Sequence, residues 1–368
     1  MSTPLPLETL ACPTPQCPLY AQPGQGNLYL RKIYGSHSTR YLRCQRCQRE
    51  FAETRGTPYW NSKIDRARFV STTEHLTEGT SLSATARLVG VHHDTVERIA
   101  LLSGQHAHTM HDQRTRGLHT TALQADERHG FVGRRANPLW EATVVDPRTK
   151  LVVALRLGRR DETLIHALLL DTKLRLADPH NLVLFTDGEV SYRTVFPQVF
   201  GTTYRPPRRH LHGRPPAVRH RIPRTLAHMQ VIKHREGKRL VKVEPRLAHG
   251  SQRRVDRELD ALGYTISNTS AIERQNGTAR QMTPHMRRKG LAFARREPTR
   301  VALAHLVTLA YNWTRLHASL KRLLVEPQGR RKYERRTPAM AAGLAERPFT
   351  LAELLGTPLY PSPAGSSH

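Results

Sequence analysis

The sequence has no long hydrophobic run, and none of its stretches approaches the roughly eighteen apolar residues that a membrane-spanning helix needs. Residues 1–13, MSTPLPLETLACP, also lack the basic and apolar regions of a secretory signal. We therefore expect a soluble cytoplasmic protein with no membrane partner. Hydrophobic residues make up 38% of the 368 positions, which is enough for a sizeable core and two or three modules.

Acidic residues are scarce relative to basic ones. The chain has 30 Asp and Glu against 58 Lys and Arg, which gives a formal net charge of +28. This excess is larger than solubility requires and suits a polyanionic partner such as nucleic acid. A basic structural protein is the alternative. The charge therefore indicates a nucleic acid as the partner, and if that partner is chromosomal DNA the protein would lie near the nucleoid.

Cysteine is also rare, and all four cysteines lie in the first fifty residues, as C-x4-C and then C-x2-C. Two such pairs can supply four thiolates to one tetrahedral zinc ion, which would be structural because no position is left open for a substrate. The proposed ligands are Cys12, Cys17, Cys44 and Cys47. Disulfides are the alternative, although nothing in the sequence indicates an oxidising compartment.

The segment between the two cysteine pairs predicts a small sheet. Residues 28–34 and 40–43 favour two strands that turn at Gly35-Ser36, and Phe51 is a candidate core residue. Residues 1–58 are therefore predicted to form a zinc ribbon.

Three helices are predicted next. Residues 65–78 favour the first helix, Ser81 or Ser83 can cap the second, Gly90 makes a turn, and residues 94–102 form the third.

Two short helices joined by a glycine turn predict a helix-turn-helix domain over residues 62–108, with an ordinary helical hairpin as the alternative. In a helix-turn-helix the first residues of the second helix face the bases. The candidates for DNA contact are His92, His93, Asp94, Thr95 and Arg98.

From residue 120 the pattern changes to strands. Residues 120–125, 139–145 and 151–157 predict an antiparallel meander, followed by a helix over 162–177. A fourth, buried strand, NLVLFTDG, ends at Asp187-Gly188. Asp126 and Asp187 follow the first and fourth strands, so their carboxylates converge if those strands are neighbours. The alternative for Asp187 is ordinary turn chemistry.

A third acid, Glu273, lies in NTSAIERQNGTAR at residues 268–280. On a helix, Glu273, Gly277 and Arg280 share one face, so the arginine could bind a phosphate at the same site. The competing interpretation is a capping box, in which Ser270 and Glu273 bond to the start of the helix.

Several motifs together resemble the transposases of bacterial insertion sequences of the insertion-sequence-one type. They are ADERHGFVG, FTDGEVSY, AIERQNGTARQ, RKGLAF and YNWTRLHASL, in this order along most of the chain. The resemblance implies an α/β chain with an RNase H-like mixed-sheet core behind a zinc ribbon and a helix-turn-helix. It also implies an Asp-Asp-Glu triad of Asp126, Asp187 and Glu273, with Arg274, Asn276 and Arg280 at the polar positions after the glutamate.

One feature departs from compact members of this type, because 86 positions separate Asp187 from Glu273. The excess lies in residues 204–262, where a β-hairpin is predicted to turn at Glu236-Gly237. Between residues 205 and 254 there are fifteen Lys or Arg and two acids. We interpret this as a basic, β-containing insertion that holds the DNA backbone, with a solvated loop as the alternative. Other acids that could serve as the third ligand are Glu236, Glu244, Asp256 and Glu258.

The insertion divides the predicted core into residues 118–203 and 263–325. An apolar helix over 301–317 is expected to pack on the sheet with Tyr311 and Trp313 in the core. Residues 326–368 should hold one or two small helices within 337–355, and a disordered tail over 357–368.

The resemblance predicts a transposase that cleaves and joins DNA through two Mg²⁺ or Mn²⁺ ions held by the triad. Its partners would be element ends and target DNA, and it would form a homo-oligomer when assembled on DNA. A nuclease without joining activity and a non-catalytic DNA-binding regulator remain alternatives.

Overall fold

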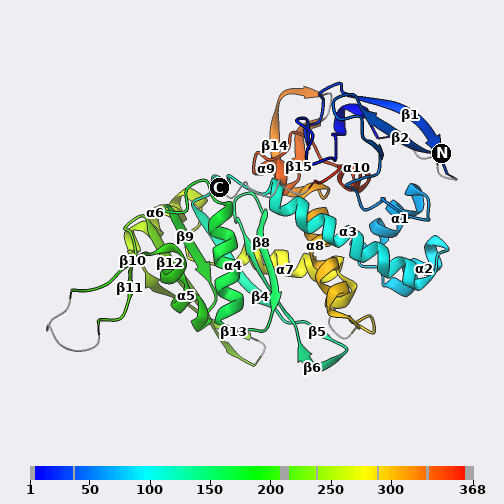
Figure 1. Ribbon diagram of the computed structural model, residues 1–368. Helices are drawn as coiled ribbons and strands as arrows, with labels where there is room; N and C mark the ends of the chain where they lie inside the picture. The colour runs from blue at the N-terminus through cyan, green and yellow to red at the C-terminus, as the bar shows by residue number, and fades with distance from the viewer. Residues whose placement is uncertain are drawn as a thin grey trace.

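The computed structural model describes residues 5–35, 38–207, 215–237, 239–287, 290–328 and 331–360. Within these ranges the chain is a mixed α/β protein built around a six-stranded sheet. Figure 1 shows this sheet on one side of the molecule and a smaller N-terminal sheet on the other, with the long helices α3 (His93–Arg114) and α8 (Glu297–Trp313) between them. None of the described helices combines the length and apolarity that crossing a bilayer requires.

The six-stranded sheet carries the predicted meander. Its strands are β4 (Ala122–Arg128), β7 (Trp140–Val145), β8 (Val152–Gly158), β9 (Leu182–Thr186), β12 (Leu226–Glu236) and β13 (Arg239–His249). They lie in the order β13-β12-β9-β4-β7-β8. The β4-β9 and β9-β12 pairs are parallel and the others are antiparallel. The first and fourth predicted strands, β4 and β9, are neighbours, which meets the condition for Asp126 and Asp187 to converge. Asp126 lies within β4.

Helices cover both faces of the sheet, which explains the unbroken apolar sequence of β9. Leu184 packs toward α4 (Glu162–Arg175) and α5 (Val190–Phe200) on one face. Phe185 packs toward α6 (Gln252–Leu262) on the other. Each buried residue of the strand therefore serves one of two cores.

The second of those faces also carries α7 (Ser270–Met282) and α8, which share a core with β7 and β8. Helix α8 begins four residues before the predicted helix and ends at Trp313, because the chain enters the hairpin of β14 (His317–Gln328) and β15 (Arg331–Arg336). Tyr311 and Trp313 are buried, as predicted.

The small N-terminal sheet consists of β1 (Leu28–Tyr34), β2 (Thr39–Cys44) and β3 (Glu50–Ala52), after a single 3₁₀ turn, η1 (Leu7–Thr9). The first two strands were predicted and the third was not. Phe51 is buried in a small core, as predicted. Ser36, the second residue of the predicted turn, lies outside the described residues.

The predicted N-terminal helices are present. Asp65 caps α1 (Arg66–Thr77), and Ser81 caps α2 (Leu82–Val89), which ends at Gly90 with φ of 71°. The predicted end of the third helix is wrong. Helix α3 runs to Arg114 instead of residue 102, because it continues along α8 with a buried stripe that includes Ala107 and Met110.

Residues 204–262 were interpreted as an insertion, but part of this segment belongs to the central sheet. Its hairpin turns where predicted, but β12 pairs with β9 and β13 extends the central sheet. A short pair, β10 (Thr202–Tyr204) and β11 (Arg219–Arg221), precedes them. Residues 208–214 lie outside the described ranges.

The C-terminal segment is more ordered than predicted. The first small helix, α9 (Pro338–Ala341), is capped by Thr337 as expected, and α10 (Leu351–Gly356) follows. The amide of Leu359 donates to the Gly56 carbonyl at 2.8 Å, and the Tyr360 hydroxyl donates to the Ala11 carbonyl at 3.0 Å. The tail therefore begins by packing on the ribbon, and only residues 361–368 lie outside the described structure.

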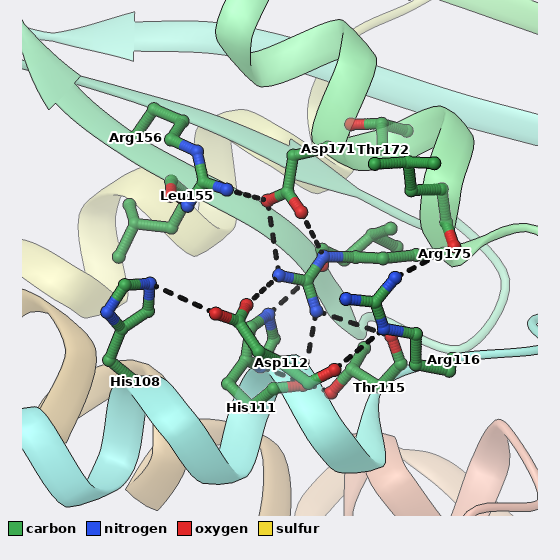
Figure 2. Close-up of polar contacts among 12 residues, drawn as sticks. His108, His111, Asp112, Thr115, Arg116, Leu155, Arg156, Asp171, Thr172 and Arg175 are labelled. Atoms are coloured by element: carbon green, nitrogen blue, oxygen red, sulfur yellow. Dashed lines mark hydrogen bonds and ion pairs between the residues drawn. The ribbon is translucent and has the colours of Figure 1, made fainter. Parts of the chain in front are cut away.

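A buried polar cluster joins α3 to the sheet domain (Figure 2). Arg175 of α4, 1% exposed by side chain, donates to Asp171 at 2.9 Å and also contacts Asp112 of α3. Arg156 of β8 reaches the same Asp171 at 3.1 Å. His108 lies 3.3 Å from Asp112. These ion pairs fix the helical N-terminal region against the sheet.

Candidate functional site

Asp126, Asp187 and Glu273 line one cleft with a volume of about 690 Å³. The cleft lies where β9 ends beside β4. Ala125 pairs with Thr186, so Asp126 on β4 and Asp187 just after β9 occupy neighbouring positions. Glu273 enters from the first turn of α7. The other charged residues that line the cleft are Arg160, Glu189, Lys233, Arg235 and Arg280.

The side chain of Asp126 sits in an environment that penalises negative charge. Burial raises its pKa to about 6, and the neighbouring charge of Asp187 adds to the rise. Burial also raises the pKa of Glu127 to about 7, again with a contribution from Asp187. Two adjacent acids on β4 therefore bind protons at higher pH than ordinary carboxyl groups do, and a bound cation would favour their ionised forms.

Asp187 is held in a defined turn after β9. Its Oδ1 accepts the Glu189 amide at 3.0 Å, and the Gln230 side chain donates to the Glu189 carbonyl at 3.1 Å. The sequence interpretation as Asp-Gly turn chemistry is thus correct in part, but the turn leaves Asp187 lining the cleft.

Alternate residues of β4 dock the glutamate helix. The Gln124 side chain accepts the Ile272 amide at 3.0 Å and donates to the Asn268 carbonyl at 2.9 Å. Asp126 accepts from the Asn276 side chain at 2.7 Å. Because residues two apart on a strand face the same side, one face of β4 fixes α7.

Arg128, the next residue on that face, belongs to a buried charge cluster. It donates to Gln275 at 2.7 Å and to Asn276 at 3.1 Å, and it contacts Glu141. Glu141 also contacts Arg300 of α8. Although burial opposes ionisation, the charges of these two arginines lower the pKa of Glu141 to about 2. The cluster thus ties β4, α7 and α8 together beneath the acids.

The capping-box interpretation of Glu273 is wrong. The Ser270 amide and hydroxyl both donate to Asn268, at 3.2 and 2.7 Å. Glu273 instead accepts from the Thr269 hydroxyl at 2.8 Å and forms an ion pair with Lys233. Its side chain is about half exposed, so it is directed into the cleft.

The three polar positions after Glu273 differ in their surroundings. Arg280 lines the cleft and its charge opposes the rise in the Asp126 pKa. Asn276 also lines the cleft, is 3% exposed, and is bonded to Asp126 and Arg128. Arg274 is exposed and lies outside the cleft lining, where its charge acts on Lys150.

Four charged cleft residues were not predicted from the sequence: Arg160, Glu189, Lys233 and Arg235. Arg160 pairs with Glu189 at 2.7 Å and with Glu127 at 3.2 Å. Lys233 overhangs the cleft because β9 ends at Thr186, opposite Gln230, whereas β12 continues. The available signal was the long basic hairpin, but its register against β9 could not be inferred from periodicity.

The predicted DNA-contact residues gather at the start of α3. His92 caps the helix by accepting the Asp94 amide at 3.3 Å, and both residues are strongly exposed. Arg98 is also exposed, whereas His93 and Thr95 are half-buried. A groove of about 720 Å³ beside them is bordered by Arg87 of α2 and by the segment around Arg296.

The four cysteines form a second site. Their sulfur atoms lie within 4.8 Å of one another, with Cys12 and Cys47 at 3.6 Å and Cys17 and Cys44 at 3.9 Å. All four are free thiols. Tetrahedral zinc with Zn–S bonds of about 2.3 Å places its sulfurs about 3.8 Å apart, so the donor set fits this ion. Among the described residues this is the one group of three or more His, Cys, Asp or Glu side chains that converges so closely.

No protein-family model matches the chain, and no curated protein matches its sequence.

Proposed function

We propose that this chain is a DNA transposase with an RNase H-like core, which cleaves and joins DNA by metal-dependent phosphoryl transfer. The observation that carries the proposal is the meeting of three acids, far apart in sequence, in one cleft of a basic protein. Further support comes from the parallel pairing of β4 and β9, which makes the two aspartates neighbours at the end of the sheet where ligands usually bind.

Carboxylates suit magnesium or manganese because hard divalent cations prefer oxygen ligands. Asp126, Asp187 and Glu273 would hold the metal ions. When bound, the metals would activate the attacking water or 3′-hydroxyl and stabilise the leaving oxygen.

The protein supplies the remaining elements. Arg280 and Arg235 line the cleft, where they would attract a phosphodiester. Asn276 orients the Asp126 carboxylate through its 2.7 Å hydrogen bond. Burial disfavours the ionised Asp126 carboxylate, and a bound cation would offset that cost.

DNA binding would involve two further regions. We propose that α2 and α3 act as a helix-turn-helix, with the exposed Arg98 among the contacts. The cysteine cluster would hold a structural zinc that shapes the adjoining ribbon. The basic hairpin of β12 and β13 would contact the DNA backbone beside the cleft.

The substitution Asp187→Asn tests the assignment. It should abolish Mg²⁺-dependent strand cleavage and leave binding of element ends nearly intact, because it removes a metal-binding charge and keeps the side-chain shape. Asp256→Asn, on the exposed side of α6, is the matched control and should cleave normally. Continued Mg²⁺-dependent cleavage by Asp187→Asn would rule out this site.

A strand-transfer assay with pre-cleaved ends separates the proposal from a nuclease on the same fold. A transposase joins such ends to target DNA, whereas a nuclease only cleaves. A protein that binds DNA but does neither would be a non-catalytic regulator.

A further inference from the structure

We propose that Lys233 is a positioning residue that occupies Glu273 in the DNA-free protein and must leave it before a metal ion can bind there. This inference rests on the proposed function, because it concerns the same cleft. It assigns Lys233 a role in coupling metal binding to DNA binding.

The contacts of Lys233 define a small, closed triangle. Its ammonium group forms an ion pair with Glu273 and donates to the Thr269 hydroxyl at 3.0 Å. Thr269 in turn donates to the same carboxylate at 2.8 Å. The lysine comes from β12, and both partners lie at the start of α7. The pair therefore bridges the sheet and the helix across the cleft.

Among the three acids, Glu273 is the one with an ion-pair partner in the described structure. Asp126 accepts a hydrogen bond from the Asn276 side chain, and Asp187 accepts one from a backbone amide, so these hydrogen-bond donors are neutral. The cation Arg160 is engaged by Glu127 and Glu189 instead. The ammonium of Lys233 thus competes with a metal directly at Glu273, and its charge also acts on Asp126 and Asp187.

The charges lining the cleft are balanced without a metal. Four acids face four bases, namely Asp126, Asp187, Glu189 and Glu273 against Arg160, Lys233, Arg235 and Arg280. Binding of divalent cations in this cleft is therefore unfavourable unless a basic side chain moves away or an anion enters. A DNA phosphate is such an anion, and Lys233 can pair with it once it has left Glu273.

The consequence is a thermodynamic coupling. DNA that pairs with Lys233 makes Glu273 available, so DNA increases the affinity for metal, and by reciprocity metal increases the affinity for DNA. A free protein that binds metal poorly would cleave DNA only after its cleft is filled by substrate.

Calorimetric Mn²⁺ titration of zinc-loaded protein, with and without an uncleavable DNA end, tests the coupling. Lys233→Met removes the charge and keeps the chain length. It should bind Mn²⁺ about tenfold more tightly than wild type without DNA, which is within the usual range of such couplings, and should lose the increase that DNA causes. Lys233→Arg should retain the wild-type pattern. Lys321→Met, an exposed lysine of β14 outside the cleft lining, is the control and should change neither affinity.

Two results overturn the proposal in distinguishable ways. In the first, wild-type protein binds Mn²⁺, Asp187→Asn abolishes this binding, and Lys233→Met binds Mn²⁺ no more tightly than wild type. Competition at Glu273 is then absent, whereas the proposed function stands. If neither wild type nor Lys233→Met binds Mn²⁺ at the cleft even with DNA, the metal site and the role of Lys233 fail together. Matching thermal unfolding curves for the two proteins exclude misfolding as the cause.

Discussion

Asp126 illustrates how a folded protein can destabilise one of its own charges. Its carboxylate is placed beside Asp187 in a largely buried position, and its pKa rises from 3.8 to about 6. A raised carboxylate pKa means that the folded state binds the proton more tightly than the unfolded state. The free energy of unfolding therefore falls as pH rises from about 4 to about 6, and the loss is complete above this window.

This linkage predicts the behaviour of Asp126→Asn. Without added Mg²⁺, the variant should unfold at a higher temperature than wild type at pH 7.5, and the difference should shrink as the pH falls through 6 toward 3.8. Adding Mg²⁺ should stabilise wild type and not the variant. Scanning calorimetry of both proteins, with Asp256→Asn as control, measures the effect. A difference that is constant with pH would refute the linkage.

At the scale of elements, the structure depends on how α3 and α7 are attached to the sheet. Helix α7 is attached through Gln124, Asp126 and Arg128 of β4, whereas α3 is attached through the cluster around Arg175 (Figure 2). Breaking a buried ion pair on one side is costly because it leaves an uncompensated charge.

Arg175→Met should therefore lower the free energy of unfolding of the sheet domain by about 3–5 kcal/mol, because Asp171 and Asp112 lose their buried partner. Arg116→Met is the matched control. Arg116 is exposed and follows the end of α3. Its substitution should lower the free energy of unfolding by less than about 1 kcal/mol. Urea unfolding followed by tryptophan fluorescence compares them. Equal effects of the two substitutions would show that burial of Arg175 contributes nothing.

The order of the elements could be read from sequence, but several of their ends and partners could not. The alternating and apolar patterns of β4, β7, β8 and β9 predicted the meander and the buried strand. Ser81 was one of two predicted caps for α2, whereas the cap of α1 at Asp65 was seen only in the structure. The end of α3 was missed because its second half is defined by packing on α8. The place of β12 beside β9 was missed because strand pairing between distant segments leaves no local signal.

The same limit applies to the site. Asp126, Asp187 and Glu273 were predicted from the sequence as candidate site residues, and the structure places them in one cleft. Arg160 and Lys233 were not identified, since a basic residue in a basic chain carries no distinguishing pattern. Glu273 was ambiguous in sequence because a capping box has the same spacing as a site residue, and its contacts with Thr269 and Lys233 resolve the ambiguity.

At the scale of the molecule, the N-terminal ribbon is a small unit that contains the four thiols, and the C-terminal segment packs on it. Its core is limited to a few residues, so a metal is expected to contribute to its folding. Asn27 donates to the Cys44 sulfur at 3.0 Å and supports the ligand set.

One zinc ion per chain is expected from elemental analysis of the purified protein, and Cys44→Ser should reduce the content well below one. Asn27→Ala should retain zinc, because it removes only a supporting hydrogen bond. Its zinc affinity, measured by competition with a chelator, should be about ten- to a hundredfold lower than that of wild type. Two disulfides in place of four reactive thiols in the native protein would contradict this prediction.

The central claim is that three carboxylates carried by β4, the end of β9 and α7 hold metal ions for chemistry on DNA. Anomalous scattering from manganese in crystals of the protein with a DNA end tests it most directly. We predict manganese bound to Asp126 and Asp187, with Glu273 turned from Lys233 toward the metal. Manganese found only elsewhere at saturating concentration, with Glu273 still paired to Lys233 beside the DNA, would contradict the claim.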